Sequence, residues 1–142
     1  MNINCRLLEK EDYNKGFLNV INHFTKNIKD ISYEQFIEYF DIIKTNSITY
    51  VAELHNKIIG TGKLLIEHKF HNNLCIMGHI EDIVIRENYR KYGIGKKITK
   101  LLLKEAKNNN CYKVSLCSSE KNKGFYQKCG FKVKDLEMTV YL

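Results

Sequence analysis

The sequence predicts a single α/β domain spanning residues 1–142, in which helices flank a mixed β-sheet. Three observations carry this prediction. Three β-rich runs (48–54, 58–69 and 75–86) follow one another, separated only by short polar breaks. A strongly amphipathic helix begins at Ile94, with apolar residues on one face and lysines on the other. No proline, repeat or linker-like segment divides the chain.

The other segments complete a β-α-α-β-β-β-α-β-α-β-β order. Ser32 and Gln35 form a capping box that opens a helix through about Lys44. Gly130 stands where a C-terminal helix cap is expected. The remaining expected elements are strands over 2–8 and 112–117, helices over 11–26 and 122–129, and closing strands over 131–133 and 137–142.

Composition bounds the class of protein. Hydrophobic residues make up 44% of the chain and charged residues 27%, which excludes wholesale disorder. No apolar run approaches the roughly 18 residues of a membrane span, and no secretory signal pattern is visible. The five cysteines form no CxxC pair, so we expect neither a disulfide scaffold nor a metal site. Free thiols indicate a reducing compartment, which we take to be the cytoplasm.

The net charge of +7 is compatible with three interpretations. A lysine-rich solvated surface is sufficient by itself. A positive potential also concentrates anionic small molecules or nucleic acids. The basic motif with interleaved aromatic residues that is typical of an RNA-binding sheet is not apparent, so charge alone decides nothing further.

The loop from Arg90 to Gly95 follows a long strand and opens the amphipathic helix. Its two glycines allow the backbone to approach a ligand closely, and the helix start offers free N–H groups to an anion. The spacing does not fit a Walker loop. It does not fit a dinucleotide fingerprint either, because Ile98 stands at the third glycine position.

What remains, R-x-x-G-x-G after a strand, resembles the pyrophosphate loop of the GNAT acetyltransferases. Three further motifs resemble one family of small GNAT enzymes, the glucosamine 6-phosphate N-acetyltransferases. They are Gly-His-Ile-Glu-Asp at 78–82, Cys-Tyr-Lys at 111–113, and the run from Asn122 through Phe125-Tyr126 to Gly130-Phe131. Weaker matches, such as Arg6-x-Leu8 and Asp12-Tyr13, extend this resemblance over nearly the whole chain.

The resemblance implies a GNAT fold, with a mostly antiparallel mixed sheet flanked by about four helices, and a homodimer. It also implies acetyl transfer from acetyl-CoA to the amine of glucosamine 6-phosphate, a step toward UDP-N-acetylglucosamine. Acetyl passes directly to the amine in this chemistry, so no nucleophilic triad is needed. The expected partners are a sugar phosphate and a second copy of the chain, without nucleic acid or membrane.

The resemblance also implies roles for individual residues. Tyr126 is expected to assist the departing thiolate, as suits a phenol donor. Coenzyme A is expected to contact Tyr126, Asn122, the backbone of Ile83, Val84 and Ile85, and the loop residues Arg90, Lys91, Tyr92, Gly93, Ile94, Gly95 and Lys96. The acceptor is expected to contact Thr25, Lys69, Glu81, Asp82, Cys117 and Tyr141, and Glu81 and Asp82 also count as candidate catalytic residues.

Each of these residues also has a simpler interpretation. Glu81 and Asp82 are neighbours on a strand, so one is expected at the surface and the other in the core or the cleft. Asn122 suits an N-cap, Lys69 a surface lysine, and Ile83–Ile85 the core. His79 is expected to be a structural residue rather than a catalyst.

The sequence departs from the family pattern at three acceptor positions. Cys117 stands where the family carries an acid, Asn72 where it carries a histidine, and Tyr141 where it carries a basic residue. These departures favour weaker binding of the sugar phosphate. Acetylation of another amine, a weakly active CoA-binding module and a basic nucleic-acid binder remain alternatives.

Overall fold

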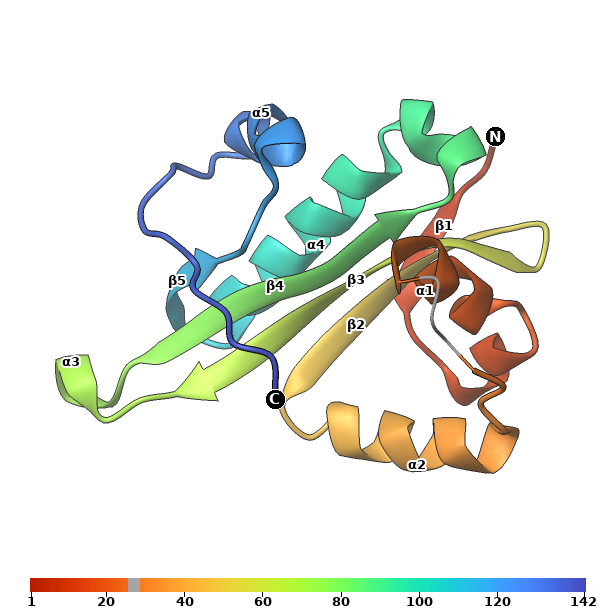
Figure 1. Cartoon of the computed structure of the whole chain (residues 1–142), viewed down its shortest axis with the longest axis horizontal. Helices are drawn as coiled ribbons and strands as arrows, with labels where there is room; N and C mark the ends of the chain where they lie inside the picture. The colour runs from red at the N-terminus through yellow and green to blue at the C-terminus, as the bar shows by residue number, and fades with distance from the viewer. Residues whose placement is uncertain (26–28) are drawn as a thin grey trace.

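The computed structural model describes residues 1–25 and 29–142. Among these residues, five strands form one sheet in the order β1-β2-β3-β4-β5 (Figure 1). The first three pairings are antiparallel and the β4–β5 pairing is parallel. The predicted mixed, mostly antiparallel sheet is therefore confirmed. The strands are β1 (Asn4–Leu7), β2 (Ser47–Leu54), β3 (Lys57–His68), β4 (Ile76–Ile85) and β5 (Cys111–Ser115).

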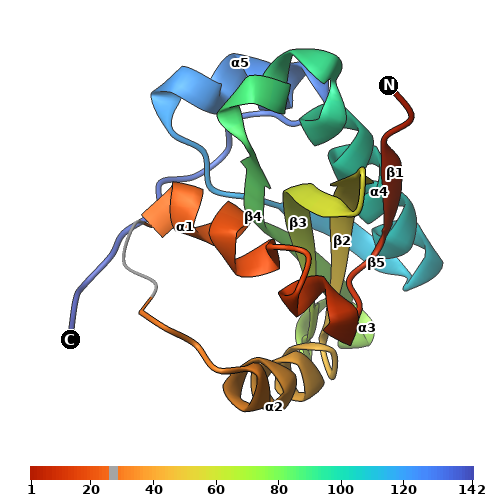
Figure 2. The same ribbon diagram turned by 90° about the vertical axis from the view of Figure 1, so that its right-hand side faces the viewer.

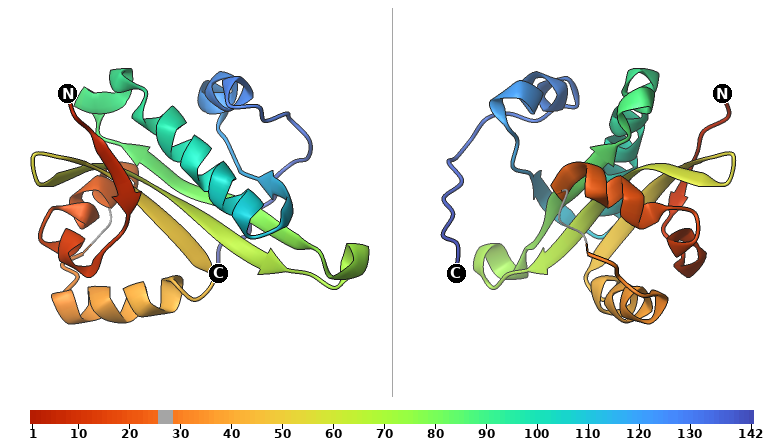
Figure 3. Two further views of the ribbon diagram at one scale, coloured as in Figure 1. Left: turned by 180° about the vertical axis from the view of Figure 1, so that it is seen from behind. Right: turned by 45° about the vertical axis from the view of Figure 1, so that its right-hand side comes forward.

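Helices lie on both faces of this sheet. The helix α4 packs along one face, and α1 lies on the opposite face with α2 below it (Figures 1 and 2). The view from behind shows α4 in front of the strands (Figure 3). The helical elements are η1 (Lys10–Tyr13), α1 (Phe17–Thr25), α2 (Tyr33–Ile43), α3 (His71–Leu74), η2 (Glu87–Tyr92), α4 (Ile94–Asn108) and α5 (Glu120–Lys128).

The main core lies between α4 and the sheet. The predicted apolar stripe of α4 is confirmed, because Ile94, Ile98 and Leu102 are almost fully buried. They pack with strand residues that include Leu64 and Ile80. A smaller cluster on the other face contains Val20 of α1 together with Val51, Ile58 and Val84 of the sheet. The two clusters place β4 between two apolar layers, so this strand is held firmly.

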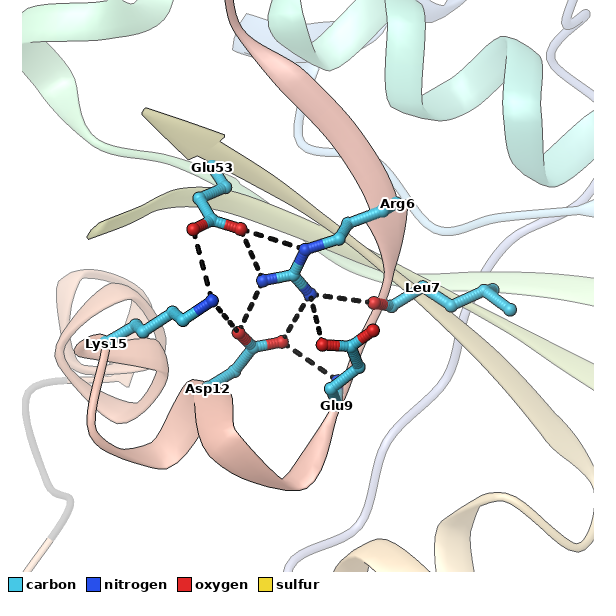
Figure 4. Close-up of polar contacts among 6 residues, drawn as sticks. All are labelled: Arg6, Leu7, Glu9, Asp12, Lys15 and Glu53. Carbon is cyan, nitrogen blue, oxygen red and sulfur yellow. Dashed lines mark hydrogen bonds and ion pairs between the residues drawn. The ribbon is translucent and has the colours of Figure 1, made fainter. Parts of the chain in front are cut away.

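A network of ion pairs anchors the N-terminal segment to the sheet (Figure 4). Asp12 of η1 is fully buried, and both of its oxygens accept hydrogen bonds from Arg6 at 2.7 and 2.8 Å. Arg6 also donates to Glu53 of β2, which accepts a further hydrogen bond from Lys15 at 3.1 Å. A buried carboxylate needs this complete set of partners. The network therefore holds the start of α1 against β1 and β2.

The predicted helix over 11–26 is wrong in its first part. Residues 10–13 form a single 3-10 turn, and the α-helix begins only at Phe17. Gly16 lies between them with φ +81°, a left-handed conformation that interrupts a right-handed helix. Lys26 lies outside the described residues.

The two closing strands predicted over 131–133 and 137–142 are also wrong. The chain after Gly130 has no regular secondary structure and stands away from the sheet (Figure 3). Beyond Phe131 its apolar side chains are exposed, with Leu136 and Met138 each 93% accessible. The alternation that predicted a strand is present, but no strand of the described chain pairs with it.

Candidate active site

The glycine loop joins η2 to the start of α4. Gly93 has φ +70°, and a Cβ placed there would meet nothing within 4 Å. The left-handed backbone conformation, and not a lack of space, is therefore the reason that glycine suits this position. A Cβ on Gly95 would lie 3.2 Å from the ring of Phe125, so the second glycine allows α5 to approach. This packing role for Gly95 is not visible in the sequence motif.

The start of α4 is suited to bind an anion. The first intrahelical hydrogen bond runs from the amide of Lys97 to the carbonyl of Gly93 at 3.0 Å. The amides of Ile94, Gly95 and Lys96 therefore come before the first intrahelical hydrogen bond of α4 and point toward the loop. No acidic residue stands in this first turn, whereas Lys96 and Lys97 do. The helix dipole and these lysines favour a phosphate group.

Beside this loop, β4 and β5 part from each other. Their parallel pairing ends at His79 and Ser115, whereas β4 continues to Ile85 while pairing with β3 on its other side. The backbone of β4 beyond His79 is therefore unpaired on its β5 side among the described residues. The side chains of Val84 and Ile85 are buried in opposite cores. Their backbone pairs with β3 on one side, and the carbonyl of Ile85 accepts a hydrogen bond from Arg90 of the loop at 3.1 Å, which ties the loop to the open edge of β4.

A β-bulge interrupts β4 within this gap. Thr61 pairs with Val84 and Lys63 with Glu81, so Gly62 faces both Asp82 and Ile83. Asp82 takes the left-handed conformation, with φ 55°. The bulge breaks the alternation expected for neighbouring strand residues, and Glu81 and Asp82 are both exposed. The expectation was that one of these acids enters the core or the cleft. Neither enters the core, and Asp82 borders a cavity.

That cavity has a volume of about 980 Å³ and lies between α1, α2 and the sheet. Asp82 borders it together with Lys63, and their charged atoms are 3.2 Å apart. Its other lining residues are mostly apolar, and they include Leu18, Ile21, Phe36 and Ile43. Polar groups line it on the strand side and also on the α2 side, where Gln35, Glu38 and Lys44 border it.

A second set of charges lies farther along β3 and β4. The Nε2 atom of His79 lies 2.7 Å from Glu67, and Lys69 lies 3.2 Å from the same carboxylate. These contacts lower the pKa of Glu67. His79 thus has a structural partner, as predicted. Lys69 already neutralises Glu67, so an incoming phosphate would have to share this lysine.

Tyr126 is the half-buried phenol of α5. The helix ends in a Schellman motif, in which Phe131 donates to the carbonyl of Tyr126 and Gly130 to that of Gln127. Gly130 has φ +97°, as its predicted cap position requires. Burial, followed by the neighbouring Cys129, raises the pKa of Tyr126. The phenol therefore keeps its proton and can act as a donor.

The same helix corrects the expectation for Asn122. α5 begins at Glu120, two residues earlier than predicted, and its N-cap is Ser119. The amide of Asn122 donates to the carbonyl of Ser119 at 3.0 Å, so Asn122 lies inside the first turn. Its exposed side chain is not the N-cap.

Cys117 lies just beyond the end of β5 and is exposed. Desolvation, a hydrogen bond to Glu137 and the charges of Glu137 and Glu81 raise its pKa. The thiol therefore stays protonated and is a poor nucleophile. Glu137 and Lys63 are two charged residues that motif reasoning missed, because neither stands in a recognisable motif.

The fold and the glycine loop agree with known proteins. Residues 11–131 match the model described as "Acetyltransferase (GNAT) family". This chain is a GNAT acetyltransferase. It is 40% identical to glucosamine 6-phosphate N-acetyltransferase 1 of Dictyostelium discoideum, over 99% of this chain and 91% of the relative. It is 36% identical to the Arabidopsis thaliana enzyme of that name, over 96% and 94% of the two chains.

Solved structures give the same assignment. The crystal structure of glucosamine-6-phosphate N-acetyltransferase from Arabidopsis thaliana matches with a TM-score of 0.95 at 35% identity, covering 99% of both chains. An acetyltransferase of Trypanosoma brucei matches with a TM-score of 0.94 at 31% identity, covering 99% of this chain and all of the other. The predicted GNAT fold and the family resemblance are both confirmed.

Within this GNAT fold, the predicted acceptor residues fall into two groups. Glu81, Asp82 and Cys117 lie near the gap between β4 and β5. Thr25, Lys69 and Tyr141 lie apart from one another. Thr25 ends α1, Lys69 follows β3, and Tyr141 lies on the exposed C-terminal segment.

No helix of the described residues is long and apolar enough to cross a membrane.

Proposed function

We propose that this acetyltransferase moves the acetyl group of acetyl-CoA to the amine of glucosamine 6-phosphate, with residues 1–142 acting as one domain. The observation that carries the proposal is the similarity, over nearly the full length, to enzymes named for that substrate. The product, N-acetylglucosamine 6-phosphate, would serve the synthesis of UDP-N-acetylglucosamine. The five free cysteines favour a reducing cytoplasm.

The parting of β4 and β5 supports a site for acetyl-CoA. On the side that β5 leaves open, the backbone of Ile83–Ile85 suits the amide groups of a pantetheine arm, which would share the carbonyl of Ile85 with Arg90. The amides of the loop over 90–96 suit a pyrophosphate. Asn122 lies in the first turn of α5, beside the same loop through the contact between Phe125 and Gly95. Together these groups would contact an extended anionic molecule along its length.

The proposed reaction is a direct transfer. The neutral amine attacks the thioester carbonyl, the carbon–sulfur bond breaks, the sulfur takes a proton and the new amide nitrogen loses one. Tyr126 supplies the proton to the sulfur, which its raised pKa supports, since the phenol stays protonated at neutral pH. Glu81 and Asp82 orient the amine and the hydroxyl groups of the sugar.

The three departures from the family pattern modify the affinity for the acceptor. Tyr141 offers a hydroxyl group but no charge to the phosphate, and Asn72 replaces a potential cation. Losing a charged hydrogen bond costs about 1.5–3 kcal/mol of binding, or about 10- to 150-fold in affinity. We therefore expect a higher KM for the sugar phosphate, with the reaction retained.

The C-terminal segment supports a homodimer. Its apolar residues alternate at positions 136, 138, 140 and 142, and all four are largely exposed. β5 is an edge strand with no neighbour on its outer side among the described residues. An exposed apolar strand pattern and an open sheet edge favour pairing between two copies of the chain.

The deciding experiment measures thiol release from acetyl-CoA with and without glucosamine 6-phosphate, using unphosphorylated glucosamine as the control. We expect fast release only with the phosphorylated sugar. Binding of acetyl-CoA without sugar-dependent release would contradict this substrate. That result would favour another amine or a weakly active CoA-binding module.

A further inference from the structure

We propose that Lys63 of β3 is a positioning residue of the acceptor site, which holds the carboxylate of Asp82 at the wall of the cavity for the acceptor to bind. This inference rests on the proposed acetylation of an amino sugar, in which Asp82 helps to orient the acceptor. Lys63 stands in none of the motifs that carry the family resemblance. Its role follows from the contacts that the fold gives it.

The bulge in β4 turns two neighbouring acids away from α4. Ile80 lies in the main core and Ile83 packs against that same core, although strand alternation would put residues three apart on opposite faces. Glu81 and Asp82, the two residues between them, are exposed. A Cβ on Gly62, which faces the bulge, would lie 2.7 Å from the side chain of Ile83, so a glycine is needed for this close packing. The bulge therefore leaves Asp82 at the border of the cavity.

The side chain of Asp82 is held mainly by Lys63. Asp82 has φ 55°, a left-handed conformation that aspartate tolerates better than most residues but that still costs free energy. Such a conformation persists where the surrounding structure holds it. The Nζ atom of Lys63 lies 3.2 Å from Oδ2 of Asp82, and this is the salt bridge that Asp82 makes among the described residues. The second carboxylate oxygen is therefore available to an acceptor.

Lys63 can fix this carboxylate because its own backbone is fixed on both sides. It lies opposite Thr49 of β2 and opposite Glu81 of β4, in the middle of the sheet. Its Nζ atom pairs with Asp82 and not with Glu81, which takes part in no salt bridge among the described residues. Thr49, Lys63 and Asp82 all border the cavity. Three adjacent strands thus supply a row of polar groups to one wall of the proposed acceptor site.

This arrangement assigns Lys63 to binding of the acceptor. A side chain that becomes ordered only when its ligand arrives lowers the affinity, and a side chain that is already held avoids this loss. Lys63 therefore improves the affinity for the amino sugar through Asp82. It does not affect acetyl-CoA, because the loop that suits the pyrophosphate lies beyond the end of β4. A direct contact between Lys63 and the phosphate group is the competing explanation.

The first test compares Lys63→Met with the wild type, because methionine keeps a similar length and removes the charge. Isothermal titration calorimetry measures the Kd of glucosamine 6-phosphate for the enzyme saturated with CoA, which carries no acetyl group to transfer. We expect this Kd, and the KM for the sugar, to rise about two- to tenfold, as for the ordering of one side chain. The KM for acetyl-CoA should stay within about twofold.

Two further variants serve as controls for the charge and for the fold. Lys63→Arg should keep the Kd within about twofold of the wild type, because a guanidinium group also pairs with a carboxylate. Lys57→Met removes an exposed lysine from the same strand and should not change the Kd. The urea midpoint of Lys63→Met should stay near that of the wild type, because its ion pair is partly exposed.

A double-mutant cycle with Asp82→Asn separates positioning from direct contact. If Lys63 acts through Asp82, Lys63→Met should cause no further rise in Kd in a chain that already carries Asp82→Asn. An equal rise in both backgrounds would overturn the inference and show that Lys63 contacts the acceptor itself. An unchanged Kd in Lys63→Met, or no recovery in Lys63→Arg, would also overturn it. A wild type that shows no sugar-dependent thiol release would instead overturn the proposed function.

Discussion

The amide of Phe131 donates a hydrogen bond to the carbonyl of Tyr126 at 3.1 Å, and the two rings lie 6.1 Å apart in an edge-to-face arrangement. The backbone turn that ends α5 therefore also fixes the phenol that we assign to the leaving thiolate. The ring of Phe125 also packs edge-to-face against Tyr126, with ring centroids 5.0 Å apart. These contacts make Tyr126 a rigid donor.

Tyr126→Phe should lower kcat about 100-fold while KM changes little. The ring remains between Phe125 and Phe131, so only the hydroxyl group is lost, and general acids contribute about 10²- to 10⁴-fold. Because burial, followed by Cys129, raises the pKa of Tyr126, its proton should remain available through the neutral and mildly alkaline range. Steady-state kinetics from pH 7 to pH 10 measure both effects. A kcat within threefold of the wild type would contradict the assigned role.

Gly130→Ala should destabilise the fold by about 1 kcal/mol. Gly130 has φ +97°, a conformation that an alanine adopts only with strain. The control is Gly124→Ala in the same helix, where a Cβ meets nothing within 4 Å and φ is not positive. That change should stabilise by up to about 1 kcal/mol, because alanine favours a helix. Urea unfolding of both variants tests the opposite signs.

Arg6→Ala should destabilise the fold by about 3 kcal/mol, because it leaves the buried carboxylate of Asp12 without its two main hydrogen bonds. Lys10→Ala is the control, since its ion pair with Asp41 is exposed and should matter by less than about 0.5 kcal/mol. Chemical denaturation at neutral pH measures both. Equal effects would show that the network adds no stability.

The same network predicts how stability depends on pH. Burial opposes ionisation of Glu53, but the hydrogen bonds from Arg6 and Lys15 outweigh it and hold the pKa of Glu53 below 4.5. Because the pKa of Glu53 is lower in the folded state than in the unfolded state, its ionised form stabilises the fold. This contribution is complete at pH values above the unfolded-state pKa, and it is lost as the pH falls through the folded-state pKa. Glu53→Gln should therefore flatten the loss of stability below about pH 4.5. Thermal melting from pH 3 to pH 7 checks this.

Tyr141→Arg should lower the KM for glucosamine 6-phosphate by about tenfold. The change adds a cation at the position where the family carries a basic residue, and a charged hydrogen bond to phosphate is of this magnitude. Activity with unphosphorylated glucosamine should not change, since that sugar lacks the phosphate. An equal gain with both sugars would show that the effect does not arise from phosphate.

Leu136→Asp with Met138→Asp should weaken the proposed homodimer. Both side chains are 93% exposed in a single chain, so the charges cost nothing there but would be buried in an interface. Sedimentation velocity over a range of concentrations measures the shift toward monomer. Lys134→Asp, on the same segment but not apolar, is the control. An unchanged distribution would exclude this segment from the interface.

The sequence by itself determined the features that depend on local chemistry. The apolar period of α4, the capping box at Ser32 and the glycine at the end of α5 are each set by neighbouring residues. The order of the motifs was enough to identify the GNAT family. The start of a helix after glycines offers free N–H groups to an anion, so the loop over 90–96 was a candidate site from the sequence alone.

Only the tertiary structure decided how the acceptor side is built. The bulge at Asp82 depends on the register shift between β3 and β4 opposite Gly62, and it leaves Glu81 and Asp82 both exposed, which simple strand alternation does not predict. The position of Cys117 beside the gap depends on the point at which β4 and β5 part. The two closing strands failed because alternation predicts a strand but cannot supply its partner. Contacts between residues distant in the chain are set by packing and pairing across the whole fold, and no local pattern encodes them.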